Sequence, residues 1–202
     1  EVLCEVARHN FPLLGLEHFR IEQADGVDYL RRMQPADWLF LDPARRDGHG
    51  SKTVAIADCE PDVSTLESLL LEKAGRVLVK LSPMLDLTQA LHTLTHVTEA
   101  HLVSAGNECK ELLLLLEQRK DLQPDDVPIH CINLPTDQPT IVFTRRTEQE
   151  ASCSYTTALH TYLYEPNASL LKAGAFRSLT HIYKVETVSY THLRAHETPE
   201  HL

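Results

Sequence analysis

The chain has 202 residues, enough for one substantial domain and a smaller one. Hydrophobic residues make up 43% of it and charged residues 24%, which is typical of a soluble globular protein, and no apolar run approaches the roughly 18 residues that span a bilayer. The formal net charge of −10 argues against long-range attraction to a polyanion, although Arg45, Arg46 and Lys52 form a local basic group.

The cysteines and histidines suggest no metal site. The five cysteines are scattered and form no CxxC pair, so their odd number and wide spacing indicate free thiols in a reducing cytosol. The twelve histidines lie at no recognisable ligand spacing. We therefore expect a cytoplasmic protein without a bound metal.

Helices and strands are expected to alternate along the first 118 residues. Helices are predicted over 2–10, 27–33, 62–73 and 86–94, strands over 19–24, 37–42, 76–81, 97–104 and 108–117, and a loop over 45–61. Strands that alternate with helices imply a parallel sheet with helices on its faces, the α/β class. The turn at residues 105–107 predicts that the last two strands form an antiparallel hairpin.

The composition changes after residue 117. Residues 119–154 are predicted to be a linker that carries two short strands, over 129–134 and 140–145. A second small unit is expected over 155–187. In it, Pro166 and Asn167 predict the start of a helix and Gly174 its end.

The segment from Asp37 to Arg46 is the most informative part of the sequence. Its short apolar run, 38–41, is typical of a strand buried on both faces, and Pro43 ends the strand because it has no N–H to donate. In open α/β sheets, the carboxyl ends of the strands form the ligand crevice. Asp42 is therefore predicted to be a catalytic or ligand-contacting carboxylate, with Arg45 beyond it. The alternative is that Asp42 only caps a backbone turn.

Four segments together resemble the class I S-adenosylmethionine-dependent methyltransferases that carry a C-terminal THUMP-like domain. They read LDPARR (41–46), VKLSPMLD (79–86), GNECKEL (106–112) and YEPNASLLKAGAF (164–176). The resemblance implies a partial Rossmann-like sheet over 1–118, followed by a small α+β THUMP-like domain. It also implies methyl transfer from S-adenosylmethionine, with RNA as the acceptor because THUMP domains accompany RNA-modifying enzymes.

The resemblance also implies roles for particular residues. Asp25 and Gly26 would bind the cofactor, and Asp42 and Pro43 would form the catalytic loop after the fourth strand. Substrate binding would fall to Arg45, Arg46 and Lys80, the arginines by gripping phosphates. In amino-group methyltransferases this loop usually carries an aromatic residue that stacks on a flipped base. Ala44 and Arg45 stand at the last two positions of that loop, so methylation of an adenine amino group is not expected.

The methyltransferase glycine-rich loop and the ribose-binding acid are not found in this sequence. The sheet of this family usually has the strand order 3-2-1-4-5-7-6. The glycine-rich loop and the ribose-binding acid follow strands 1 and 2, which lie between strands 3 and 4 in the sheet. We therefore expect the strand at 19–24 to lack a neighbour, the run 38–41 to form an exposed edge, and the chain alone not to bind S-adenosylmethionine measurably.

The end of the chain, 188–202, resembles a translated sequencing adapter and is left out of the fold prediction. A metal-binding tail through His192, His196 and His201 is the competing interpretation.

Two alternatives to the enzyme remain open. One is a non-catalytic RNA-binding or scaffolding protein that keeps the methyltransferase fold. The other is a dinucleotide-binding enzyme with a different strand order, which the terminal hairpin disfavours.

Overall fold

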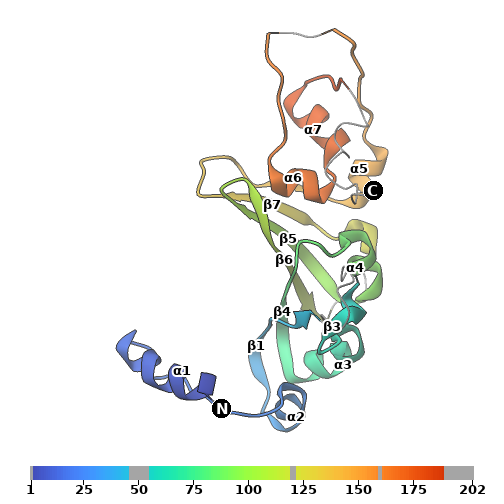
Figure 1. Ribbon diagram of the computed structural model, residues 1–202. Helices are drawn as coiled ribbons and strands as arrows, with labels where there is room; N and C mark the ends of the chain where they lie inside the picture. Colours follow the sequence, from blue (N-terminus) through green and yellow to red (C-terminus); the bar gives the residue numbers. More distant parts are fainter. Residues whose placement is uncertain (1, 46–54, 119–121, 159–160, 189–202) are drawn as a thin grey trace, which may run out of the picture. The chain divides into compact units, whose positions relative to one another are not determined.

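The computed structural model describes residues 2–45, 55–118, 122–158 and 161–188 (Figure 1). The chain divides into two compact units, residues 1–35 and residues 36–202. No helix among the described residues is both long enough and apolar enough to cross a membrane. Most of segment 188–202, which resembles a translated adapter, lies outside the described residues.

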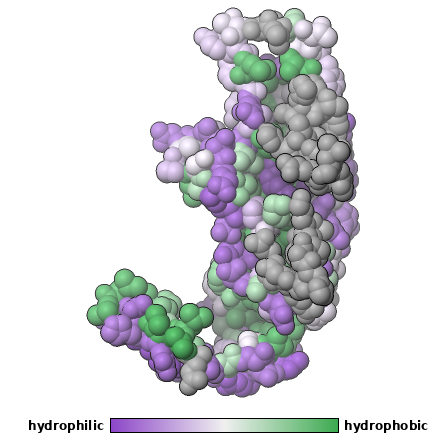
Figure 2. All heavy atoms as spheres, in the orientation of Figure 1, coloured by the Kyte–Doolittle hydropathy of each residue, from purple (hydrophilic) through white to green (hydrophobic). Residues whose placement is uncertain are grey.

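The described part of the first unit contains two helices, α1 (Val2–Leu13) and α2 (Gly26–Arg32). α1 buries none of its side chains, and hydrophobic atoms are exposed along it in Figure 2. The turn after α1 contains Gly15 at φ +74°, a conformation that glycine adopts readily. The strand predicted over 19–24 is wrong, because these residues form no strand and pair with none. This agrees with the expectation that the segment lacks a neighbour.

The second unit is built on a six-stranded mixed sheet. In spatial order its strands are β1 (Ala36–Leu41), β4 (Ala74–Leu81), β6 (Glu108–Glu117), β5 (Val97–Ala105), β7 (Ile129–Leu134) and β8 (Ile141–Phe143). β1 runs parallel to β4 and β5 parallel to β7, whereas β6 is antiparallel to both β4 and β5, and β8 is antiparallel to β7. The predicted hairpin is confirmed, but the sheet is mixed rather than parallel throughout.

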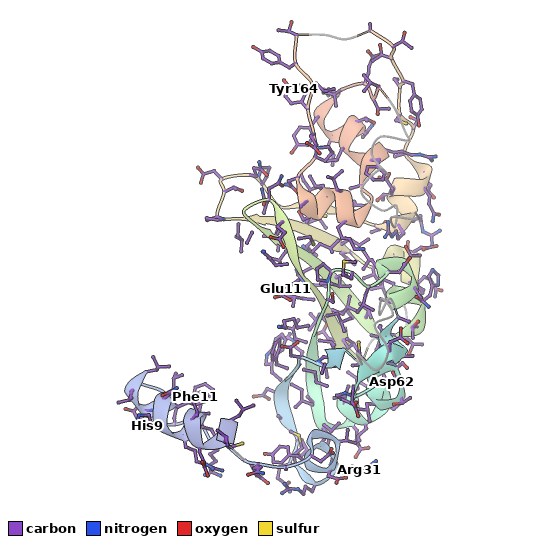
Figure 3. The ribbon with its side chains drawn as sticks, in the orientation of Figure 1. His9, Phe11, Arg31, Asp62, Glu111 and Tyr164 are labelled. Carbon is purple, nitrogen blue, oxygen red and sulfur yellow. The ribbon has the colours of Figure 1, made fainter. Side chains whose placement is uncertain are left out.

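The described residues of this unit form five α-helices: α3 (Val63–Lys73), α4 (Leu87–Thr93), α5 (Arg145–Glu150), α6 (Ala168–Ala173) and α7 (Phe176–Tyr183). The helices predicted over 62–73 and 86–94 are confirmed as α3 and α4. Each begins at an aspartate that accepts a backbone N–H: Asp62 from Ser64 at 2.9 Å and Asp86 from Gln89 at 2.8 Å. Figure 3 shows Asp62 at the start of α3.

The segment predicted as a loop contains more structure than expected. β2 (Ala44–Arg45) pairs antiparallel with β3 (Cys59–Glu60), and the 3₁₀ helix η1 (Ile56–Asp58) comes directly before β3. Residues 46–54, including Arg46 and Lys52, lie outside the described residues. Further along, η2 (Pro124–Asp126), β7 and β8 follow β6. The two strands expected within a linker therefore extend the main sheet.

In the described part of this unit, helices cover one face of the sheet. Alternate residues of the central strands point to that face and are buried to 3% exposure or less: Val77, Val79, Leu81, Leu102, Leu112, Leu114, Leu116 and Ile129. Figure 1 shows α3 and α4 together on one side of the sheet, and α6 contacts β5, β6 and β7. The Cys131 Sγ donates to the Ser169 carbonyl at 3.7 Å, which places α6 on the covered face as well.

The opposite face, called here the open face, has half-buried or exposed side chains. Its residues include Trp38, Phe40, Leu78, Lys80, Glu111, Leu113, His101 and His130. Trp38 is 51% exposed and Phe40 61%, so the prediction that β1 is buried on both faces is wrong. β1 is the edge strand of the sheet, which confirms the expected exposed apolar edge.

α5 holds the two C-terminal helices by interactions with their ends. The Nη1 of Arg145 donates to the carbonyl of Ala173 at the C-terminus of α6, at 2.7 Å. The carboxylate of Glu148 accepts the first three N–H groups of α7, at 2.7–3.0 Å. A cation at a helix C-terminus and an anion at a helix N-terminus both interact favourably with the helix dipole. The predicted helix start at Asn167 and stop at Gly174, φ +70°, are both confirmed.

Candidate active site

The carboxyl ends of β1 and β4 bring Asp42 and Lys80 together. The parallel register pairs Leu41 with Val79, so the next residues lie side by side on the open face. The Lys80 Nζ lies 2.7 Å from the Asp42 Oδ2. The side chain of Asp42 is 54% exposed and that of Lys80 31%, so solvent or a ligand can reach both. The other carboxylate oxygen, Oδ1, has no recorded partner among the described residues, and it could accept a hydrogen bond from a substrate.

Electrostatics keep this lysine charged. The hydrogen bond to Asp42 raises the pKa of Lys80, and the negative charge of Glu111 raises it further. Glu111 lies at the start of β6, which reaches the same edge because it runs antiparallel to β4. Figure 3 shows Glu111 on the side of the sheet away from α3 and α4. Two carboxylates therefore flank one ammonium group at this edge.

Pro43 and Arg45 follow directly in the chain. Pro43 separates β1 from β2, and the backbone of Arg45 pairs with that of Cys59. This small ladder directs the chain away from the main sheet after Asp42. The side chain of Arg45 and the whole of Arg46 lie outside the described residues, so their predicted grip on phosphate remains a prediction.

Asp25 and Gly26 have a clear local role in the first unit. The Asp25 Oδ1 accepts the N–H groups of Val27 and Asp28, both at 2.9 Å, and so caps α2. Gly26 is the first residue of that helix. Their predicted contact with a cofactor stays a prediction. The capping bonds occupy one carboxylate oxygen.

Two of the segments noted in the sequence meet in space. Gly106 and Asn107 both have φ +59°, the geometry of a tight hairpin turn between β5 and β6. The Asn107 Oδ1 accepts the N–H of Ala168 at 2.9 Å, at the start of α6. The turn therefore anchors the C-terminal helices beside the carboxyl end of β5. Sequence reasoning picked out both segments but did not predict this contact.

A cavity of about 470 Å³ lies between α4, α5 and the C-terminal helices, and sequence reasoning missed it. Arg145, Lys172 and Arg177 line it, together with Asp86 and Glu148. The Nε of Arg145 is buried without a hydrogen-bond partner among the described residues. The cationic lining and this free donor suit an anionic group. Asp42 and Lys80 do not line the cavity.

The structure is similar to a solved protein. A crystal structure described as a putative methyltransferase from Porphyromonas gingivalis W83 superposes with a TM-score of 0.79 at 40% sequence identity, over 89% of this chain. The chain spans only 45% of that protein's length. The six-stranded sheet is therefore a methyltransferase-like α/β fold. No curated protein is significantly similar to the chain.

A family model described as a ferredoxin-like domain matches residues 162–195. This corrects the expectation for the C-terminal part, which matches that family and not a THUMP-like one. The match includes α6, α7 and the first residues of the segment 188–202. Within the described part of 155–187 there are two helices and a single bridge, between Tyr155 and Thr187.

Proposed function

We propose that this chain is the substrate-side half of an S-adenosylmethionine-dependent methyltransferase. The observation that carries the proposal is the sheet order β1-β4-β6-β5, with β6 antiparallel to both neighbours. It corresponds to strands 4-5-7-6 of the class I methyltransferase sheet that the sequence resembles. In that order Asp42 follows the fourth strand, on the substrate side of the methyl donor.

Asp42 is proposed to position the acceptor group, or to take its proton, during methyl transfer. The Asp42 Oδ1, which has no partner among the described residues, can accept a hydrogen bond from an amino or hydroxyl group. Lys80 holds the other oxygen at 2.7 Å and so fixes the orientation of the carboxylate. Lys80 is thereby proposed as a positioning residue as well as a substrate contact.

RNA is the acceptor that we propose. The net charge of −10 repels a polyanion at long range, so the support for RNA comes from a local group of cationic side chains. The cavity supplies Arg145, Lys172 and Arg177, and a phosphate could accept a hydrogen bond from the buried Nε of Arg145. If Lys172 contacts a phosphate, Lys172→Gln should weaken RNA binding and lower its salt dependence by about one unit of slope.

Methyl transfer is best tested in a chimera. The part of the Porphyromonas gingivalis neighbour that this chain does not cover would be joined to this chain. Transfer of a labelled methyl group from S-adenosylmethionine to total RNA would then be measured. Methylated RNA is the expected result. Cofactor binding with no labelled RNA or protein would contradict catalysis and favour the non-catalytic scaffold, whereas labelled protein would contradict only the RNA part.

A further inference from the structure

Two histidines and a glutamate converge on the open face of the sheet. Glu99 and His101 are two residues apart on β5, so their side chains leave the same face. The parallel register of β5 and β7 places His130 directly beside His101. The sequence gives no hint of this group, because its members are separated by one and by 28 residues in the chain.

The three side chains present one ligand atom each toward a common point. The His101 Nε2 lies 3.0 Å from the Glu99 Oε2, and the His130 Nε2 lies 3.9 Å from the same oxygen. The two imidazole rings stack, with centroids 4.5 Å apart and planes 17° apart. All three ligand atoms lie within 4.8 Å of one another. Metal–ligand bonds of roughly 2.0–2.2 Å put neighbouring ligands about 3–3.5 Å apart, so only small side-chain shifts are needed.

The surroundings favour metal binding over a simple ion pair. His101 and His130 are flanked on the same face by Leu113 and Val142, their partners in the ladders with β6 and β8. In addition, Glu99 can hydrogen-bond only one of the two rings at these distances.

We infer that Glu99, His101 and His130 bind a divalent first-row transition-metal ion such as Zn²⁺. Two imidazole nitrogens and one carboxylate oxygen are a donor set that such ions accept, and three protein ligands leave a coordination position open. The side chains of these residues are 23–43% exposed, so that position can be reached by water or a ligand. This inference departs from the expectation of no metal and does not depend on methyl transfer.

The site shares a row of the sheet with the candidate active site. Lys80 pairs with Leu113, and Leu113 pairs with His101, so the cluster lies two strands from Lys80. At the usual strand spacing this is roughly 10 Å. A metal there would lie on the same face of the sheet as the Asp42–Lys80 pair, with one strand between it and Lys80.

The experiment is a calorimetric titration of the 202-residue chain with Zn²⁺ at pH 7.5, in a weak competing chelator that suppresses adventitious binding to the other histidines. We expect one tight equivalent in the wild type. The double variant His101→Gln/His130→Gln should lose it, and Glu99→Gln should weaken it at least about tenfold. Two controls should keep it: His92→Gln, on α4, and a variant with His192, His196 and His201 replaced by Gln.

Further measurements distinguish binding at this site from binding at other histidines. Zn²⁺ should also raise the Tm of the wild type, and the ligand variants should lose that rise. Co²⁺ should give visible absorption bands that the double variant lacks. Circular dichroism establishes that the variants are folded, and Glu99→Gln carries the test if the double variant is not. No tight equivalent in the wild type, an equivalent retained by the double variant, or one lost only in the tail variant would overturn the inference.

Discussion

The Nζ of Lys80 lies 2.7 Å from the Oδ2 of Asp42, across the carboxyl ends of two parallel strands. The contact follows from the register of β1 and β4, which sets the two residues beside each other on the open face. It joins the most distinctive residue of the sequence to a partner 38 residues later in the chain. The carboxylate of Asp42 is therefore oriented by a neighbouring strand, and its catalytic role stays a prediction.

We expect Asp42→Asn, made in the chimera, to reduce single-turnover methyl transfer by ~10²–10⁴-fold while leaving cofactor affinity nearly unchanged. The amide keeps the size of the side chain but removes its charge and part of its acceptor capacity. Asp37→Asn is the matched control, since Asp37 is an exposed aspartate near the other end of β1. Near-wild-type turnover in Asp42→Asn would mean that Asp42 has no catalytic role.

The same substitution should lower the pKa of Lys80. The hydrogen bond to Asp42 is the largest cause of the raised pKa, so its loss moves the value back toward that of an ordinary lysine. The stabilisation that this contact gives the fold is present below the ordinary lysine pKa and is lost as the pH rises through the raised one. NMR titration of the lysine side chains, with Lys80 assigned through Lys80→Arg, measures the shift. An unchanged pKa would show that the ion pair does not form in solution.

We expect Glu148→Ala to destabilise the C-terminal helices. Its carboxylate accepts three N–H groups at the start of α7, and alanine leaves them without that partner. Loss of a helix-capping side chain costs about 0.5–2 kcal/mol, which lowers the Tm by about 2–4 °C per kcal/mol in a chain of this size. Glu150→Ala, an exposed glutamate on the same helix, is the control. Equal melting temperatures for the two variants would contradict this role.

Cys131 should react more slowly than Cys4 and Cys153 under native conditions. Burial raises its pKa to about 12, so at pH 8 almost none of it is the reactive thiolate. Cys4 and Cys153 are only partly buried and should react first with a thiol reagent. The order of labelling can be read by mass spectrometry of peptides, and denaturant should abolish the difference. Rapid native labelling of Cys131 would mean that α6 does not stay docked over β7.

The sequence by itself determined most of the local structure. Asp62 and Asp86 begin helices because an aspartate can cap backbone N–H groups within its own turn, and Gly106 with Asn107 turns the hairpin because both positions need a positive φ. The strand that precedes Asp42 was also recognisable, because its apolar run stops at an acid and a proline. In each case the deciding interaction lies within a few residues of chain.

Only the tertiary structure decided which distant residues meet. The exposure of Trp38 depends on the edge position of β1, and the segment 19–24 lacks strand structure because no neighbour pairs with it. The meeting of His101 with His130 and the three bonds from Glu148 to α7 likewise depend on strand register and helix docking. Register is set by the packing of the whole sheet, and a shift of one residue would move every side chain to the other face. Local sequence patterns therefore predicted the helices, strands and turns but not the composition of the sites.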